Sequence, residues 1–177
     1  METPQIQAKL QALAGVQVLE LGSLIAGPYA AALLAQSGAE VIKIEPPASD
    51  DSPGGDPLRT WRKLQAGTSL WWYSQSRNKK SVALDLKTTE ARDIVRKLVA
   101  TTDILIENFR PGTRSITYSA CSMPPRYRPG AYTAADIAAD IAADPHYAAL
   151  GEHTERVLAS IGIDRAGYGR LRDRGIV

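Results

Sequence analysis

The 177-residue sequence predicts an α/β fold, a Rossmann-like parallel sheet with flanking helices. Short apolar strand-like runs separated by two helical segments occur within residues 16–108. Parallel strands need long crossover connections, and such connections are right-handed. This order of elements therefore predicts a right-handed βαβαβ unit.

The first strand is predicted at Val16–Leu21 ("VQVLEL"), a run rich in Val and Leu that is typical of a strand buried on both faces. Gly22 ends it. Pro28 suits the first helical turn, where its missing N–H would be unpaired in any case, and helix-forming residues continue to Gly38 at a C-cap position. The second strand follows at residues 39–45 ("AEVIKIE").

A loop of about a dozen turn-forming residues, "PPASDDSPGGDP", comes next, and loops of this length are often associated with binding. Another strand is predicted at Ser81–Leu86 ("SVALDL"), and Thr88 suits the N-cap of the helix after it. A further strand, "DILIEN", is predicted at residues 103–108. Apolar residues recur at helical spacing between these strands: Ala91, Ile94, Val95 and Leu98.

The pattern changes after this point. Residues 114–131 have no sustained period and are predicted to form an irregular connection. The unit "IAAD" then occurs twice in tandem, with Ile137 and Ile141 one helical turn apart, so the duplication extends a helix without reversing its apolar face. Two short helices joined at Gly162 are predicted next. Three apolar residues share one face there: Val157, Leu158 and Ile161.

Composition excludes several classes of protein. The 21 basic and 19 acidic residues are interspersed and leave a net charge of +2, unlike the strongly basic surface of a nucleic-acid-binding protein. No apolar run approaches the ~20 residues that a membrane span needs. Cys121 is the only cysteine, so no internal disulfide can form, and the first residues lack a secretory pattern. We therefore expect a cytoplasmic location.

A dinucleotide site is one interpretation of the first unit, because Glu45 ends the second strand where an acid could bind a ribose hydroxyl. The glycines do not support it. The G-x-G-x-x-G pattern is replaced by Gly22 and Gly27 followed at once by Pro28, which removes a backbone N–H that such a site uses. The amino end of the helix can still receive an anionic or polar group.

Aromatic and basic residues gather in residues 71–80, which include Trp71 and Trp72 and the sequence "SRNKKS". They are either a tryptophan core beside a solvated charge run, or a platform for a purine ring and its phosphates. The basic residues concerned are Arg77, Lys79 and Lys80. His146 and His153 have no Cys or acid at ligand spacing, so no metal site is predicted, and His153 is expected to start a helix.

Three stretches together resemble the class III CoA-transferase (CaiB/BaiF) family in order and spacing. They are "GVQVLELGSLIAGPYAAALLAQSGAEVIKIEPP", "SRNKKSVALDLKTTEARDIVRKLVATTDILIENFRPG" and "GEHTERVLASIGIDRAGYGRLRDRGIV". The resemblance covers nearly all of Leu13–Thr113 and about Tyr132–Val177, where "YTAADIAADPHYA" with one extra "IAAD" resembles the segment before the family's last helices.

The resemblance implies a Rossmann-like large domain, a smaller second domain and an interlocked dimer. It also implies transfer of CoA between an acyl-CoA and a carboxylate, with CoA as substrate and no permanently bound cofactor. In the family a catalytic Asp attacks the thioester, forms an enzyme-bound anhydride and becomes an aspartyl-CoA thioester, a covalent route that divides one difficult transfer into easier steps.

The resemblance also implies which residues contact CoA. Lys87 and Arg110 are expected to meet phosphates, and Ile25 and Phe109 to flank adenine or the pantetheine arm. The matching positions lie in three segments: Ile25 and Ala26; Leu84, Asp85, Leu86 and Lys87; Asn108, Phe109 and Arg110.

The chain departs from the family because the relatives are longer and their middle has no counterpart here. Residues 1–113 match the Rossmann-like CoA-binding part of the large domain, 132–177 its C-terminal helical part, and 114–131 a deletion junction. The catalytic Asp is not identifiable: its position corresponds to Tyr132, and Asp136 is not assigned the role. An excised middle would uncover sheet edge or helix surface and favour self-association.

Three functional hypotheses follow. The first is a shortened class III CoA-transferase by descent. The second is a non-catalytic CoA-binding or interaction subunit that pairs with a full-length paralogue. The third is a nicotinamide-dependent oxidoreductase, and the fold alone does not separate it from the others.

Overall fold

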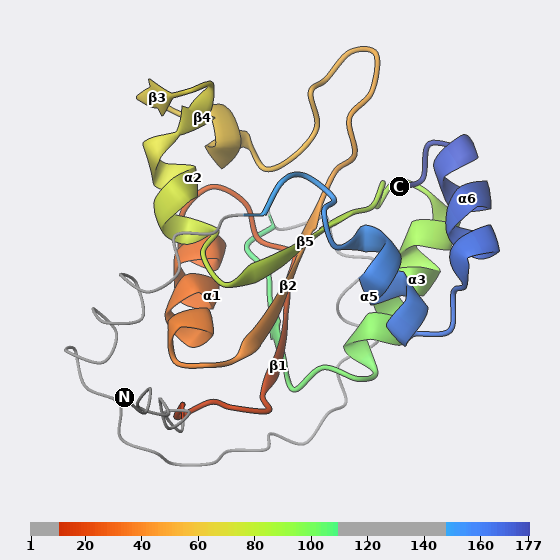
Figure 1. Ribbon diagram of the computed structural model, residues 1–177, viewed down its shortest axis with the longest axis horizontal. Helices are drawn as coiled ribbons and strands as arrows, with labels where there is room; N and C mark the ends of the chain where they lie inside the picture. Colours follow the sequence, from red (N-terminus) through yellow and green to blue (C-terminus); the bar gives the residue numbers. More distant parts are fainter. Residues whose placement is uncertain (1–10, 110–147) are drawn as a thin grey trace, which may run out of the picture.

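A computed structural model describes residues 11–109 and 148–177. Its centre is a four-stranded parallel sheet (Figure 1), which confirms the parallel sheet that the sequence predicted; the strand order, which the sequence did not predict, is β5-β2-β1-β6. The strands are β1 (Gln17–Glu20), β2 (Glu40–Glu45), β5 (Lys79–Ala83) and β6 (Ile104–Ile106). The tandem "IAAD" helix, Cys121 and His146 lie outside the described residues.

Helices cover both faces of this sheet. Figure 1 shows α1 (Ala26–Gln36) on one side and α3 (Thr89–Val99), α5 (Thr154–Ser160) and α6 (Arg165–Asp173) on the other. The predicted cap of α3 is confirmed, since the Thr88 hydroxyl accepts the N–H of Ala91 at 3.2 Å. Ser37 caps α1, and Gly38 follows with φ of +97°.

Strand β5 begins and ends earlier than the strand predicted at Ser81–Leu86. Lys79 pairs with Val41 and Ala83 with Glu45, so β5 contains both lysines of "NKKS". It ends after Ala83 because the pairing with β2 stops there: Leu84 still donates to the Glu45 carbonyl of β2, but Asp85 donates to the carbonyl of Ile176, the penultimate residue.

Between β2 and β5 the chain forms a small insert that the sequence did not predict. It contains a short helix η1 (Pro57–Thr60), a two-stranded hairpin of β3 (Leu64–Gln65) and β4 (Thr68–Ser69), and α2 (Leu70–Gln75). Figure 1 places α2 beside α1, on the same side of the sheet.

The two sheet faces differ because side chains alternate along each strand. One face is aliphatic and packs in one core with α3 and α5. The other packs Val18 and Val41 against alanines of α1 and also buries charged side chains. The aliphatic set is Leu19, Leu21, Ile42, Ile44, Val82 and Leu84; the buried polar set is Glu20, Lys43, Glu45, Lys79 and Ser81.

The C-terminal segment covers the outer edge of β5. The Ser81 carbonyl accepts the N–H of His153, and the Thr154 hydroxyl accepts the N–H of Ala83. His153 is the N-cap of α5, which confirms its predicted place at a helix start. An otherwise open strand edge is thereby paired. Among the described residues, no helix is long and apolar enough to cross a membrane.

Candidate functional site

The candidate site lies at the carboxyl ends of β1 and β6. The strand order reverses direction at β1, because β2 follows on one side of it and β6 lies on the other. Open α/β sheets place their ligand crevices at such a switch point. The segments that meet there are the turn Gly22–Ile25, which connects β1 to α1, and Asn108 after β6.

Asn108 joins these two segments. Its side-chain oxygen accepts the N–H of Ser23 at 2.8 Å, and its amide donates to the Ser23 carbonyl at 2.9 Å. A Cβ on Gly22 would come within 2.9 Å of the Gly27 Cα and 3.0 Å of the Asn108 oxygen. The two glycines are therefore required for close packing of the turn, which is a different use from the pyrophosphate contact of a dinucleotide site.

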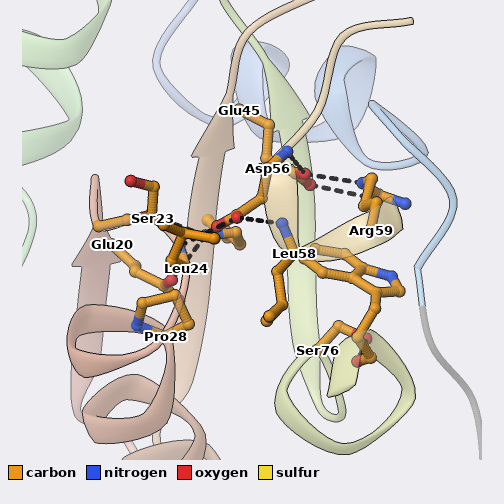
Figure 2. Close-up of polar contacts among 12 residues, drawn as sticks. Glu20, Ser23, Leu24, Pro28, Glu45, Asp56, Leu58, Arg59 and Ser76 are labelled. Carbon is orange, nitrogen blue, oxygen red and sulfur yellow. Dashed lines mark hydrogen bonds and ion pairs between the residues drawn. The ribbon is translucent and has the colours of Figure 1, made fainter. Parts of the chain in front are cut away.

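Leu24 adopts a left-handed backbone conformation within this turn, with φ of +63°. Asp56, near the end of the loop after β2, contacts it: one carboxylate oxygen accepts the N–H of Leu24 at 3.0 Å and that of Leu58 at 2.8 Å (Figure 2). A left-handed leucine is costly without such support, because its Cβ crowds the backbone.

Lys43 lies beneath the turn and is almost completely buried. Its ammonium group contacts Glu20 at 2.7 Å, Asp56 at 2.8 Å and the Gly22 carbonyl at 2.9 Å. Burial alone would lower the pKa of Lys43, but the carboxylates of Glu20 and Asp56 together raise it above its usual value. Lys43 is therefore charged and neutralises two buried acids.

Lys79 reaches the same group from β5. Its ammonium donates to Glu20 at 2.8 Å and to the Pro28 carbonyl of α1 at 2.7 Å. Burial lowers the pKa of Lys79 to about 8; Glu20 opposes this shift, and the nearby charge of Lys43 adds to it. Glu20, Lys43, Asp56 and Lys79 form one buried ion cluster, which we call the lysine–acid cluster.

Protein groups occupy the buried Glu45 carboxylate, which contradicts the ribose-binding interpretation. Its carboxylate binds the Arg59 guanidinium through both oxygens at 2.8 Å (Figure 2) and accepts the Ser81 hydroxyl at 2.7 Å. It also accepts the N–H of Asp56 at 2.8 Å. Glu45 is thus a fully occupied structural acid that anchors Asp56.

For residues 71–80, the structure favours the tryptophan-core alternative over the purine platform at Trp72 and Lys79. Trp72 is 1% exposed and packs beneath the Arg59 guanidinium, which lies 3.9 Å from the ring centre. Lys79 is buried in the lysine–acid cluster, whereas Lys80 forms a surface pair with Glu40 across β2. The two lysines have different surroundings because successive residues of β5 face opposite sides of the sheet.

The structure places the predicted CoA-contacting residues in two groups. Ile25 and Ala26 are exposed at the amino end of α1, beside Asn108. Asp85, Leu86 and Lys87 follow β5, with β2 between them and β1, and Lys87 is exposed. Leu84 is completely buried in the core, Phe109 packs partly against the same core, and Arg110 lies outside the described residues.

Sequence reasoning missed the lysine–acid cluster and its contact with the turn. A signal was present, because "VLEL" and "VIKIE" each carry a charge inside an apolar strand that parallel pairing buries on both faces. Such a charge predicts a buried partner of opposite sign.

The model of CoA-transferase family III matches residues 13–122, which is more than half of the chain. The chain belongs to CoA-transferase family III. The matched residues contain the whole candidate site, including the turn, Asp56 and Asn108.

Matches to individual relatives agree with this family assignment. The chain is 52% identical over 99 residues to succinyl-CoA–D-citramalate CoA-transferase of Chloroflexus aurantiacus, a match covering 55% of this chain and 23% of the relative. It is 40% identical over 107 residues to human succinyl-CoA:glutarate CoA-transferase, covering 60% and 23%. The crystal structure of a CaiB/BaiF family protein from Brucella suis is 36% identical with a TM-score of 0.50, covering 58% of this chain and 28% of that one. The chain thus matches only about a quarter of the length of these relatives.

Proposed function

We propose that this chain is the CoA-binding part of a class III CoA-transferase and binds CoA or acyl-CoA at the switch point. The observation that carries the proposal is the turn Gly22–Ile25. It lies within the family-matched segment, is held by polar contacts with Asn108, Asp56 and Lys43, and presents an exposed apolar residue and the amino end of α1 at the switch point. A preformed site of this kind binds without the cost of ordering a loop.

Each retained segment has a distinct role in this proposal. Ile25 supplies an apolar surface for the adenine or the pantetheine arm, and Ala26 lets the ligand approach α1 closely. Lys87 and Arg110 provide cations for the phosphates. Leu84 supports the site from within the core, because none of its surface is exposed.

Transfer itself requires a nucleophilic carboxylate. Its oxygen attacks the thioester carbonyl, the carbon–sulfur bond breaks, and CoA departs as a thiolate while a mixed anhydride forms on the enzyme. The thiolate then attacks the enzyme's own acyl carbon, which gives an enzyme–CoA thioester and releases the carboxylate product. The acids beneath the turn do not suit this role, since Glu20, Glu45 and Asp56 are buried and held in ion pairs. In this proposal these acids serve structure, and the nucleophile comes from elsewhere.

Calorimetric titration tests the binding proposal. We expect wild-type protein to bind CoA and not NAD, because Glu45 is occupied and the turn lacks the pyrophosphate glycines. Lys87→Ala should weaken CoA binding about tenfold by removing a phosphate contact. Lys97→Ala, an exposed lysine at the other end of α3, is the matched control and should bind CoA normally. Binding of NAD in preference to CoA contradicts the proposal.

Intact-mass measurement tests catalysis separately. After incubation with an acyl-CoA, a covalent adduct that hydroxylamine removes shows that the chain carries its own nucleophile. Its absence, together with CoA binding, supports a CoA-binding subunit without transfer activity.

A subunit that pairs with a longer paralogue is the second candidate, and the outer face of α1 favours it. Tyr29 and Leu33 lie one turn apart there and are 56% and 42% exposed. Relatives from Chloroflexus aurantiacus include proteins named as alpha and beta subunits of succinyl-CoA–L-malate CoA-transferase. We expect the chain to self-associate or to bind such a paralogue, and a stable monodisperse monomer in sedimentation contradicts the expectation.

We also propose that residues 1–113 and 132–177 belong to one domain, joined through 114–131. The contacts of Ser81 and Ala83 with residues 151–154 support this, because they tie the second segment to the central sheet.

A further inference from the structure

We propose that Asp56 is a positioning residue: it holds the turn Gly22–Ile25 in the conformation in which the amino end of α1 receives CoA. The inference rests on the proposed CoA-binding function. It adds a residue that makes no expected contact with CoA and acts through the backbone of Leu24.

Asp56 belongs to the loop that follows β2, and its side chain extends toward the turn after β1 (Figure 2). The residue is 3% exposed. One carboxylate oxygen binds the N–H groups of Leu24 and Leu58, and the other faces the Lys43 ammonium at 2.8 Å. The carboxylate therefore connects the turn to both η1 and β2.

The hydrogen bond from the turn to Asp56 is made by Leu24, the residue whose backbone is left-handed. Leu24 has φ of +63°, a conformation that L side chains rarely adopt. In this conformation of the turn the N–H of Leu24 donates to the Asp56 carboxylate at 3.0 Å. An anionic acceptor makes that hydrogen bond stronger than a neutral one would.

Two further features keep Asp56 in place. Lys43 neutralises its charge and donates to the Gly22 carbonyl, so the Lys43–Asp56 ion pair contacts the turn at two points, the Gly22 carbonyl and the Leu24 N–H. Glu45 accepts the backbone N–H of Asp56 and is itself fixed by Arg59. A loop whose sequence is rich in turn residues is thus anchored at its last position.

A double-mutant cycle with Leu24→Gly tests the role. Glycine adopts positive φ without steric cost, so a turn with glycine at position 24 depends less on Asp56. We expect Asp56→Ala to weaken CoA binding about tenfold in the wild-type background and by a clearly smaller factor in the Leu24→Gly background. Asp51→Ala, an exposed acid of the same loop, is the matched control and should bind CoA as wild type does. An equal loss in both backgrounds, or no loss on Asp56→Ala, overturns the proposal.

Hydrogen exchange separates this inference from the proposed function. The Leu24 amide should lose protection in Asp56→Ala and keep it in Asp51→Ala, whether or not CoA binds. If wild-type protein does not bind CoA, the proposed function fails and the exchange result still decides whether Asp56 holds the turn. If Asp56→Ala does not fold, Asp56→Asn replaces it in the same cycle: it keeps the side-chain size but offers only a neutral, weaker acceptor, so the Leu24 amide should lose part of its protection. Unchanged protection of the Leu24 amide in the folded variant overturns the inference.

Discussion

The two faces of the central sheet are built from the same strands but differ in what they bury and in what they stabilise. On the α3 face, strand residues such as Leu19 and Ile44 pack with Leu98 and Leu158 in an aliphatic core. On the α1 face, alternate residues of the same strands bury Lys43 within the lysine–acid cluster. The first face supplies hydrophobic stability, and the second holds the backbone of the turn that precedes α1.

The difference shows that the charged face restrains backbone geometry more strictly than the aliphatic face does. An aliphatic core tolerates changes of shape as long as volume is kept, whereas a buried ion cluster needs every partner in its place. The turn after β1 contacts the charged face through Gly22 and Leu24, so its backbone is set by directed bonds. The candidate ligand site contains a left-handed leucine and therefore lies on the face where the direction of hydrogen bonds sets the backbone.

Among these substitutions, Lys43→Met should lower the stability of the protein most. The variant leaves Asp56 without its counter-ion and Glu20 with Lys79 alone, so we expect unfolding free energy to fall by about 3–5 kcal/mol. Urea denaturation monitored by circular dichroism measures it. Lys97→Met, an exposed lysine on α3, is the control. A loss below about 1 kcal/mol shows that the cluster is not stabilising the charged face.

Leu98→Ala probes the aliphatic face and should cost about 2–4 kcal/mol, because Leu98 is 2% exposed and its removal leaves a cavity under α3. Leu33→Ala on the outer face of α1 is the matched control, since Leu33 is 42% exposed and should change stability by less than about 0.5 kcal/mol. The comparison of faces predicts one further result: Leu98→Ala should leave the amide exchange of Leu24 unchanged, unlike Lys43→Met. Equal loss of protection in both variants contradicts separate roles for the two faces.

The Lys79 ammonium makes the charged face sensitive to pH. Its pKa is about 8 in the folded protein against 10.5 in the unfolded chain, so between these values the unfolded state binds more protons. The contribution of Lys79 to unfolding free energy therefore rises with pH through this window, with a slope of up to about 1.4 kcal/mol per pH unit. Below pH 8 both states hold the proton and the slope vanishes.

The measurement is the difference in unfolding free energy between wild type and Lys79→Met from pH 7 to pH 10. Other titrating groups contribute to both proteins and cancel to first order. A difference that rises above pH 8 supports the assignment, and a flat difference shows that the folded protein holds Lys79 with an ordinary pKa.

The sequence predicted the aliphatic face better than the charged one, because its pattern is local. The spacing of Ala91, Ile94 and Leu98 and the cap at Thr88 identify α3 without any distant information. The parallel strands follow from apolar runs separated by helices. The bounds of β5 were wrong because pairing with β2 and the departure toward Ile176 decide where it starts and ends.

The candidate site depended on contacts between distant segments. Asp56 binds Leu24 32 residues away, and Lys79 binds Glu20 59 residues away. A charge in a buried strand indicates that a partner exists, but spacing does not identify it. Position 24 carries no glycine to mark its left-handed backbone, so nothing local predicted that turn. The resemblance to the family located the turn, and the structure supplied its support.

Lys80→Met should change the unfolding free energy least. It compares the two faces of the sheet within a single dipeptide, because Lys79 and Lys80 are neighbours. Lys80 follows Lys79 on β5 but points to the opposite side of the sheet and pairs with Glu40 at the surface. Solvent screens such a pair, so we expect a loss of about 0.2–1 kcal/mol that disappears near 1 M salt. Lys79→Met at pH 7 leaves Glu20 with one counter-ion in a buried site, and high salt should not restore the free energy that this change costs. Equal, salt-dependent losses for the two lysines would show that solvent reaches the charged face and that the lysine–acid cluster is open.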